Sequence, residues 1–355
     1  MSPRTLKVAV AGLGRMGTRH ALHFLNRTPR ATLVAAFSPD PAELAWAKHH
    51  LEPFGVTLYA DYDEMLKHGG LEAVVISTVT TVHAEQAVKA INKDLHVLCE
   101  KPLSTSVEVS QTVVDAARSK PHLKVLCGFS RRFDASYRRA FEKTDSGAIG
   151  RPCIVRSQTC DKLDRTGFFI QYAAKSGGIF VDCQLHDVDL ALWFLGQDSI
   201  PKSCTAIGIR ATAPELAAHG DVDNGVAIVE FWGGKLAYFY CSRIMAAGQH
   251  DMTEIIGTEG KIAVNAAPAT DLVEFHEPGG VRREIPQNYY GRFEQAFVTE
   301  ANEFTAAVLD DTPLPFRLDT AVRVLEICAA LQESVVSGKK IFFDEIGRRV
   351  ERAQL

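Results

Sequence analysis

The chain has 355 residues, of which 46% are apolar and 23% are charged. These values are typical of a folded globular protein, and they exclude a disordered chain, a collagen-like chain and a small disulfide scaffold. The 39 basic and 43 acidic residues give a formal net charge of −4, which disfavours a nucleic-acid-binding protein because that class carries a basic excess. The length favours two domains.

The eight cysteines show no CxxC spacing and no Cys/His cluster, so the sequence indicates neither a zinc site nor a disulfide framework. No apolar run approaches the ~20 residues needed to cross a bilayer, and we expect no membrane partner. Reduced thiols, together with strand-like sequence from Leu6 onward that leaves no room for a signal peptide, favour a cytoplasmic location. The weaker alternative is peroxisomal, because Ala353-Gln354-Leu355 loosely resembles that address.

The first 130 residues alternate short apolar runs with amphipathic stretches. The runs expected to form strands are Leu6–Ala11, Leu33–Phe37, Ala73–Ser77, His96–Cys99 and Lys124–Gly128. The stretches expected to form helices are Thr18–Asn26, Ala42–His50, Ala84–Asn92 and Val107–Ser119. Continuous apolar strands alternating with helices predict a doubly wound α/β parallel sheet of the Rossmann type over residues 1–130.

Beyond about residue 150 the pattern changes to short β-rich runs separated by turns. These runs are Cys153–Thr159, Cys204–Arg210, Gly225–Phe231, Lys235–Ser242, Thr253–Ile256, Lys261–Asn265 and Leu272–His276. The Gly233-Gly234 pair predicts a tight hairpin. Helices are expected at Val181–Leu195, at Glu294–Leu309, and at Asp319–Ser337 with Gly338 as its C-cap. Residues 131–355 are therefore predicted to form an α+β domain with a large, mainly antiparallel open sheet.

A glycine-rich motif, Gly12-Leu13-Gly14-Arg15-Met16-Gly17, follows the first strand and opens the first helix. In this position the first glycine permits a tight turn, the second lets the backbone approach a pyrophosphate, and the third allows close packing of helix and strand. The free N–H groups of the helix terminus favour the phosphates of a dinucleotide. We therefore expect NAD(P) to bind here.

The residue that reads the adenosine ribose is expected at the end of the second strand, where an NAD-specific site usually has an acid. Ser38 occupies that position, 21 residues after Gly17. A serine does not repel a 2′-phosphate, and Arg15 adds a positive charge nearby. These two residues favour NADP over NAD, with Asp40 as the substitute acid if the cofactor is NAD.

Glu100-Lys101-Pro102 follows the strand His96–Cys99, at the end where open α/β sheets bind their ligands. An ammonium at Lys101 would stabilise the alkoxide that develops as an alcohol is oxidised. A solvent-exposed lysine before a loop proline is the plain alternative.

Asp182 and His186 are four residues apart, so a continuous helix would place them on one face, with Asp189 near the same stripe. A carboxylate one turn from an imidazole orients the ring and stabilises its protonated form, as required of a general acid/base. The alternatives are an intrahelical Asp–His pair without chemistry and a metal site formed by these three residues. No further ligand cluster supports a metal, and we predict none.

These motifs together resemble the Gfo/Idh/MocA oxidoreductases, which include glucose–fructose oxidoreductase and inositol 2-dehydrogenase. The resemblance covers nearly the whole chain, and the overall sequence pattern is most similar to that of uncharacterised fungal members. It implies hydride transfer between a nicotinamide and a CH–OH or C=O group of a sugar, inositol or related cyclic polyol. It also implies that Lys101, Asp182 and His186 are catalytic, that Arg131 lies near cofactor or substrate, and that the C-terminal sheet builds a homodimer or homotetramer.

Some positions depart from the family pattern. The loop from Thr78 to His83 lacks the family's proline, although we still expect both residues, with Met16 and Glu100, at the cofactor. The segment that contains Asp161 and Tyr172 also differs, and these two are candidate substrate-binding residues. An exposed turn is the alternative for that segment.

Three other functions remain open at this stage. One is a non-catalytic NAD(P)-binding sensor of the same fold, which has no chemical need for Lys101, Asp182 and His186. Another is an NAD-dependent glycosidase, and the last is a reductase of aromatic dihydrodiols or biliverdin-like substrates.

Overall fold

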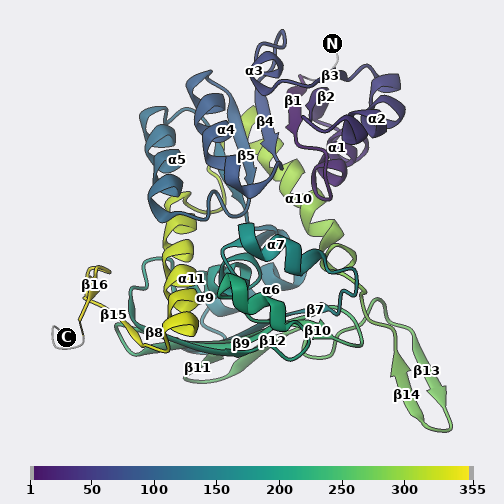
Figure 1. Ribbon diagram of the computed structural model, residues 1–355. Coiled ribbons are helices and arrows are strands. Elements are labelled where there is room, and N and C mark those ends of the chain that lie inside the picture. The colour runs from purple at the N-terminus through teal and green to yellow at the C-terminus, as the bar shows by residue number, and fades with distance from the viewer. Residues whose placement is uncertain (1–3, 352–355) are drawn as a thin grey trace. The chain divides into compact units, whose positions relative to one another are not determined.

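A computed structural model describes residues 4–351 (Figure 1). The chain divides into two compact units. Unit 1 comprises the chain up to Phe133 together with Gln295–Val322, and unit 2 comprises Asp134–Glu294 together with the chain from Arg323 onward. The expected division at residue 130 therefore differs from the structure in that residues 295–322 belong to unit 1. The division depends on which distant parts of the chain contact one another, and sequence periodicity does not contain that information.

Unit 1 contains a six-stranded parallel sheet in the order β3-β2-β1-β4-β5-β6. Its strands are β1 (Leu6–Ala11), β2 (Ala31–Phe37), β3 (Thr57–Tyr59), β4 (Ala73–Ile76), β5 (His96–Glu100) and β6 (Val125–Gly128). All four residues of β4 and all of β6 are buried, as expected for strands covered on both faces. The predicted Rossmann-type sheet is thus confirmed; only the three-residue β3 was missed.

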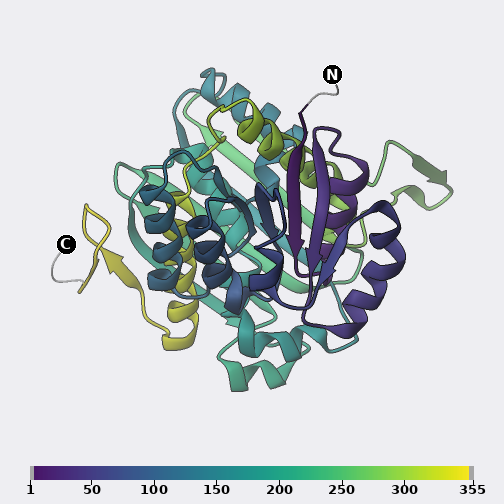
Figure 2. The same cartoon turned by 90° about the horizontal axis from the view of Figure 1, so that it is seen from above.

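The helices that connect these strands are α1 (Gly17–Asn26), α2 (Pro41–His50), α3 (Tyr62–Met65), α4 (Thr80–Asn92) and α5 (Val107–Ser119). Short 3₁₀ turns lie at Glu52–Phe54 and Ser130–Phe133. Helices α4 and α5 lie side by side (Figures 1 and 2). The carboxyl ends of the strands carry the glycine-rich loop and the Glu100–Pro102 segment, so the fold brings the expected cofactor residues to one edge.

Unit 2 contains an eight-stranded mixed sheet in the order β12-β11-β7-β10-β9-β8-β15-β16. Its strands are β7 (Pro152–Lys162), β8 (Pro201–Ile209), β9 (Asn224–Phe231), β10 (Lys235–Met245), β11 (His250–Gly257), β12 (Lys261–Val264), β15 (Ile341–Phe343) and β16 (Arg349–Val350). Neighbouring strands pair antiparallel, except for β10 with β7, which are parallel. The predicted mainly antiparallel sheet is confirmed, and Gly233 and Gly234 form its tight turn with φ of +80° and +73°.

The run expected as a strand at Leu272–His276 does not join this sheet. It contributes β13 (Glu274–Glu277), which pairs with β14 (Gly280–Arg283) in a separate two-stranded hairpin. Figure 1 shows this hairpin projecting from the sheet of unit 2.

The helices of the second half are α6 (Ala135–Asp145), α7 (Phe168–Ser176), α8 (Ile179–Asp182), α9 (Leu185–Leu195), α10 (Tyr289–Leu309) and α11 (Asp319–Ser337), with a 3₁₀ turn at Pro214–His219. The division between the units falls inside α10 and again inside α11. The expected helix Val181–Leu195 is wrong as one continuous element, because it is interrupted at Cys183 and Gln184. Gly338, with φ of +70°, ends α11 as expected.

No helix within residues 4–351 is long and apolar enough to span a membrane. The C-terminal Ala353-Gln354-Leu355, on which the peroxisomal alternative rests, lies outside the described residues.

Candidate active site

The glycine-rich loop leaves no room for side chains at two of its three glycines. A Cβ on Gly12, whose φ is +86°, would lie 2.6 Å from the carbonyl oxygen of Ser77. A Cβ on Gly17 would lie 1.8 Å from the carbonyl oxygen of Gly12. The loop is therefore held close to β4 and to the start of α1, as a pyrophosphate-binding turn requires.

The first turn of α1 is open for an anion. Its N-cap, Met16, makes no side-chain capping hydrogen bond, and the turn carries no acidic residue. Arg15 is exposed at the same place. Backbone N–H groups and the positive end of the helix dipole thus favour phosphate here.

A carboxylate stands beside this loop, and it comes from a residue that the sequence analysis missed. Glu43, on α2, accepts hydrogen bonds from the Leu13 amide at 3.0 Å and from the Ser38 hydroxyl at 2.6 Å. Ser38 is fully buried. Its hydroxyl proton is therefore engaged by Glu43 and does not serve a 2′-phosphate.

Asp40, the expected substitute acid, is used to cap α2. Its Oδ1 accepts a hydrogen bond from the Ala42 amide at 2.8 Å. The negative charge nearest the glycine-rich loop is thus that of Glu43, five residues beyond the position at which an acid was expected.

The loop from Thr78 to His83 is closed by its own side chains. The His83 ring is 2% exposed, with Nδ1 2.9 Å from the Pro102 carbonyl oxygen and Nε2 3.0 Å from the Thr78 carbonyl oxygen. The Thr78 hydroxyl donates to Gln86 at 2.7 Å. His83 thus connects this loop to the segment after Lys101, even without the family's proline.

The Glu100-Lys101-Pro102 segment ends β5. Lys101 is half-buried, and the Lys101–Pro102 peptide bond is cis. The Glu100 carboxylate accepts the Lys101 amide at 3.2 Å and contacts Nε2 of His20, on α1, at 2.7 Å. The backbone at Lys101 is therefore held by Glu100 on β5, which is held in turn by His20 on α1.

In unit 2, Asp182 is the last residue of α8 and His186 is the second residue of α9. The one-face argument for the pair is wrong, because the two residues lie on different helices. Asp182 forms an ion pair with Arg243, on β10, with Oδ2 2.8 Å from Nη2. The Arg243 guanidinium also stacks 4.4 Å from the ring centre of Phe169.

The residue after His186 anchors this region. Asp187 is fully buried and accepts hydrogen bonds from the hydroxyls of Ser157 and Thr159, on β7, and from the Gln184 amide, at 2.5 to 2.6 Å. These bonds attach the first turn of α9 to the sheet and so fix the backbone at the half-buried His186.

The two candidate substrate residues lie on regular elements, so the expected exposed turn covers only the few residues between them. Asp161 is on β7, where its Oδ1 accepts the Gln249 side-chain amide at 2.9 Å. Tyr172 is on α7, where its ring stacks on Phe168 with 5.6 Å between ring centres. Both side chains are half-buried.

Arg131 lies in unit 1, in the 3₁₀ turn after β6, and is 3% exposed. Among residues 4–351, no group of three or more His, Cys, Asp or Glu side chains is arranged to hold a metal ion.

Four residues that the structure brings to the site were not predicted from the sequence, and these are Glu43, His20, Gln249 and Arg243. The first two sit near recognisable motifs, whereas the other two lie in ordinary β-rich sequence and give no signal.

A parallel sheet of this strand order, a glycine-rich turn before α1, and a lysine at the end of β5 define a nicotinamide-dependent dehydrogenase with a second, β-rich domain. The chain belongs to the GFO/IDH/MocA oxidoreductases. Residues 6–129 match the family's NAD-binding Rossmann domain, and residues 137–263 match its C-terminal domain.

Relatives match over nearly the full length. The scyllo-inositol 2-dehydrogenase (NAD(+)) of Bacillus subtilis is 31% identical, with 96% of each chain covered. The myo-inositol 2-dehydrogenase of Thermotoga maritima is 27% identical over 96% of this chain and 99% of that one. A crystal structure of scyllo-inositol dehydrogenase from Lactobacillus casei with bound NAD(H) and scyllo-inositol superposes with a TM-score of 0.90 at 32% identity, covering 96% of this chain and 99% of that one.

Proposed function

We propose that this protein is an NAD-dependent dehydrogenase of an inositol or a closely related cyclic polyol. The observation that carries the proposal is the match to the scyllo-inositol enzymes over 96% of the chain, with Lys101, Asp182 and His186 all present. The bound nicotinamide supplies the acceptor for the hydride that leaves the reacting carbon.

The chain's own residues handle the proton and the charge. The Lys101 ammonium stabilises the developing alkoxide and so lowers the pKa of the substrate alcohol. His186 takes the hydroxyl proton. Asp182, which is ion-paired with Arg243, is proposed to stabilise the positive charge that His186 then carries. Arg131, Asp161 and Tyr172 are proposed to contact substrate or cofactor.

For the cofactor we propose NAD, which departs from the preference for NADP based on the sequence. Glu43 places a carboxylate beside the Leu13 amide, and it engages the Ser38 hydroxyl that was expected to donate to a 2′-phosphate. The negative charge of Glu43 at this position repels the 2′-phosphate of NADP. Gly12, Gly14, Arg15, Met16 and Gly17 are proposed to hold the pyrophosphate, with Thr78, His83, Glu100 and Lys101 at the nicotinamide end.

The test is a panel of inositols, other polyols and sugars, assayed with NAD and with NADP by absorbance of the reduced nicotinamide. We expect turnover on an inositol with NAD. Tight nucleotide binding without turnover on any member would contradict the proposal and favour a sensor. Cleavage of glycosides without net NADH would indicate a glycosidase, and turnover restricted to aromatic dihydrodiols would indicate the remaining alternative.

We also propose that the protein is a homo-oligomer through the outer face of the sheet in unit 2. This face carries exposed apolar side chains on adjacent strands, with Ile207 opposite Val226 and Ile228 opposite Tyr238. Along β9, buried and exposed residues alternate, so one face of the sheet packs against the core. The apolar side chains of the other face have no covering layer in the single chain.

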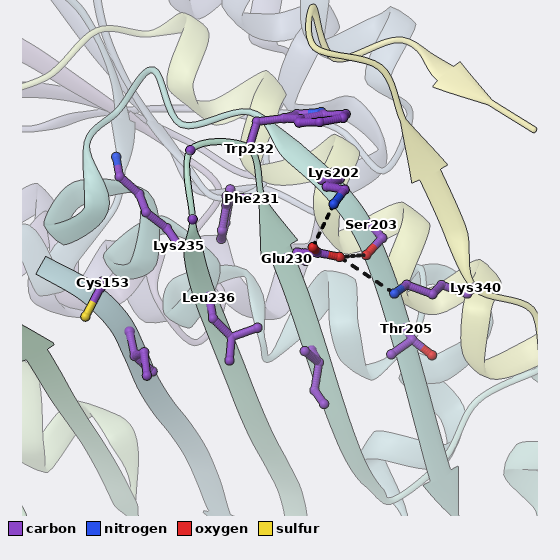
Figure 3. A pocket seen from close by; sticks show the side chains of 14 residues that line it. Cys153, Lys202, Ser203, Thr205, Glu230, Phe231, Trp232, Lys235, Leu236 and Lys340 are labelled. Carbon is purple, nitrogen blue, oxygen red and sulfur yellow. Dashed lines mark hydrogen bonds and ion pairs between the residues drawn. The ribbon is translucent and has the colours of Figure 1, made fainter. Parts of the chain in front are cut away.

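A pocket of about 680 Å³ opens on the same sheet, and Figure 3 shows its lining. Glu230 lies there between Lys202, at 3.0 Å, and Lys340, at 3.8 Å. Thr205, Ile228 and Leu236 continue the lining along the strands. The pocket is thus contiguous with the apolar face, and its carboxylate, Glu230, is already paired with two lysines, which suits an interface between copies better than a separate catalytic site.

Cytoplasmic location and closeness to fungal members remain predictions from the sequence. The relatives reported above come from Bacillus, Thermotoga and Lactobacillus.

A further inference from the structure

A cluster of buried ionisable side chains adjoins the backbone of Lys101, and the proposed chemistry gives a role to only one of its members, Glu100. Its members are His20 on α1, Glu100 at the end of β5, and Glu300 on α10. Their exposed fractions are 1%, 9% and 0%. All three belong to unit 1, although they are widely separated in the sequence. Buried ionisable groups are costly to fold, so a cluster of three requires an explanation.

Both oxygens of Glu100 are engaged. Oε1 contacts Nε2 of His20 at 2.7 Å, and Oε2 accepts the backbone amide of Lys101 at 3.2 Å. Burial opposes the charged form, but the hydrogen bond and charge of His20, with the charges of Lys101 and His83, hold the pKa of Glu100 below its usual range. Glu100 is therefore a carboxylate, and His20 must donate the proton in the contact between them.

The third member, Glu300, differs in its surroundings. Neither of its carboxyl oxygens has a hydrogen-bond partner among the described residues. Burial, and then the negative charge of Glu100, raise the pKa of Glu300 well above its ordinary value. Phe297, one turn earlier on α10, packs edge-on against the His20 ring at 5.9 Å. Helix α10 thus packs the Phe297 ring against His20 and brings a second buried carboxyl group within electrostatic reach of Glu100.

We propose that His20 is a positioning residue for Lys101, which it holds in place through Glu100. The inference rests on the proposed function, in which Lys101 stabilises the alkoxide. His20 fixes one carboxylate oxygen, so the other remains aimed at the Lys101 amide. The backbone from which the lysine side chain extends is then determined at the carboxyl end of β5, and an apolar side chain at residue 20 would release it.

The decisive variants are His20→Leu, which removes the donor, and His20→Gln, which restores an N–H near the position of Nε2. We expect His20→Leu to lower kcat about 10- to 100-fold, the size of effect produced by a displacement of about 1 Å in a reacting group. The Kd for NAD should change less than about twofold. We expect His20→Gln to recover most of kcat.

A second measurement needs no substrate. Amide hydrogen exchange at Lys101, resolved to single residues by mass spectrometry with fragmentation, should accelerate at least about tenfold in His20→Leu and remain near wild type in His20→Gln. The matched control is Thr28→Val. It removes another buried hydrogen bond of α1, from the Thr28 hydroxyl to the His23 carbonyl at 3.0 Å, without touching Glu100.

Unchanged Lys101 exchange in a folded His20→Leu protein would overturn the proposal, as would equal losses of kcat in Thr28→Val. A loss confined to NAD affinity would also overturn it, because His20 would then serve the cofactor site. Absence of wild-type turnover on any inositol would contradict the proposed function alone, since the exchange experiment still decides whether His20 holds Lys101.

Discussion

At the scale of single residues, Glu43 alters the expected cofactor. The acid that distinguishes NAD from NADP usually lies at the end of the second strand, where this chain has Ser38. The structure instead brings the carboxylate from the first turn of α2, bonded to the hydroxyl of Ser38 and to the amide of Leu13. The charge is therefore present at the glycine-rich loop even though the position expected for it is neutral.

Glu43→Gln tests this charge. The variant keeps the size of the side chain and an acceptor oxygen, but it removes the repulsion of a 2′-phosphate. We expect the ratio of kcat/KM for NAD over NADP to fall about tenfold, the effect of one charge in a partly solvated site. Steady-state kinetics with both cofactors measure the ratio. A wild-type protein that already prefers NADP would show the NAD proposal to be wrong.

His186→Ala tests the proposed acid/base. We expect kcat to fall about 10²- to 10⁴-fold, because the proton of the reacting hydroxyl loses its acceptor. The affinity for NAD, measured by fluorescence titration, should remain unchanged. Near-normal turnover of this variant would remove His186 from the mechanism.

Glu300 predicts a dependence of stability on pH. Its pKa in the folded chain is raised by burial and by Glu100. Between the unfolded pKa and this raised value, the folded chain retains a proton that the unfolded chain has lost. The contribution to the free energy of unfolding is therefore complete at low pH and declines as the pH rises through this window.

In Glu300→Gln the decline should disappear. Relative to wild type, the variant should gain up to about 1.4 kcal/mol per pH unit across that window. Urea denaturation at a series of pH values measures the difference. Parallel curves for the two proteins would mean that Glu300 is ionised in the folded chain.

At the scale of elements, the break between α8 and α9 is the main difference from expectation. Apolar periodicity runs through residues 181–195 without interruption, so the pattern predicts one helix. Asp187 instead takes three hydrogen bonds from Ser157, Thr159 and Gln184, which attach the start of α9 to β7. Asp182 is left on the preceding turn, where it meets Arg243.

Asp187→Asn should therefore weaken the attachment of α9. An Asn side chain presents N–H groups where one carboxylate oxygen stood, so the donors at that oxygen must turn away or flip, and the negative charge that strengthens all three hydrogen bonds is lost. We expect a loss of about 1–3 kcal/mol in the free energy of unfolding, measured by urea denaturation. Asp115→Asn, on the exposed face of α5, is the control and should change stability by less than about 0.5 kcal/mol.

At the scale of the whole molecule, the outer sheet face of unit 2 decides the expected assembly. Ile207 and Ile228 are 72% and 43% exposed in the single chain. Burial of such residues favours association by roughly 25 cal/mol for each Å² of apolar surface. Because the face consists of regular strands, a second copy can cover it without rearrangement.

Ile228→Glu should dissociate the oligomer, since the new charge would be buried in the interface at a cost of several kcal/mol. The side chain is outward-facing, so the protomer should still fold. Analytical ultracentrifugation measures the mass. Phe54→Glu, which changes an exposed residue of unit 1, is the control. A wild-type monomer, or an Ile228→Glu protein with the wild-type mass, would contradict the proposed interface.

Features that depend on neighbours along the chain could be predicted from the amino-acid sequence. Apolar runs gave the parallel strands, Gly233-Gly234 gave a hairpin, and the glycine spacing after β1 gave the phosphate-binding turn. Each of these is a local preference of the backbone, which a short window of sequence contains. The motif order also placed Lys101 at the carboxyl end of a strand.

Contacts between side chains that are distant in the sequence could not be predicted, because they depend on how the elements pack in the folded chain. Glu43 meets Ser38 and Leu13, Arg243 meets Asp182, and residues 295–322 return to the first unit. His20 and Glu100 are 80 positions apart in the sequence, yet their side chains are hydrogen-bonded to each other next to Lys101. Such pairings follow from packing between elements, and a periodic pattern records which face of an element is buried but not which residue it is buried against.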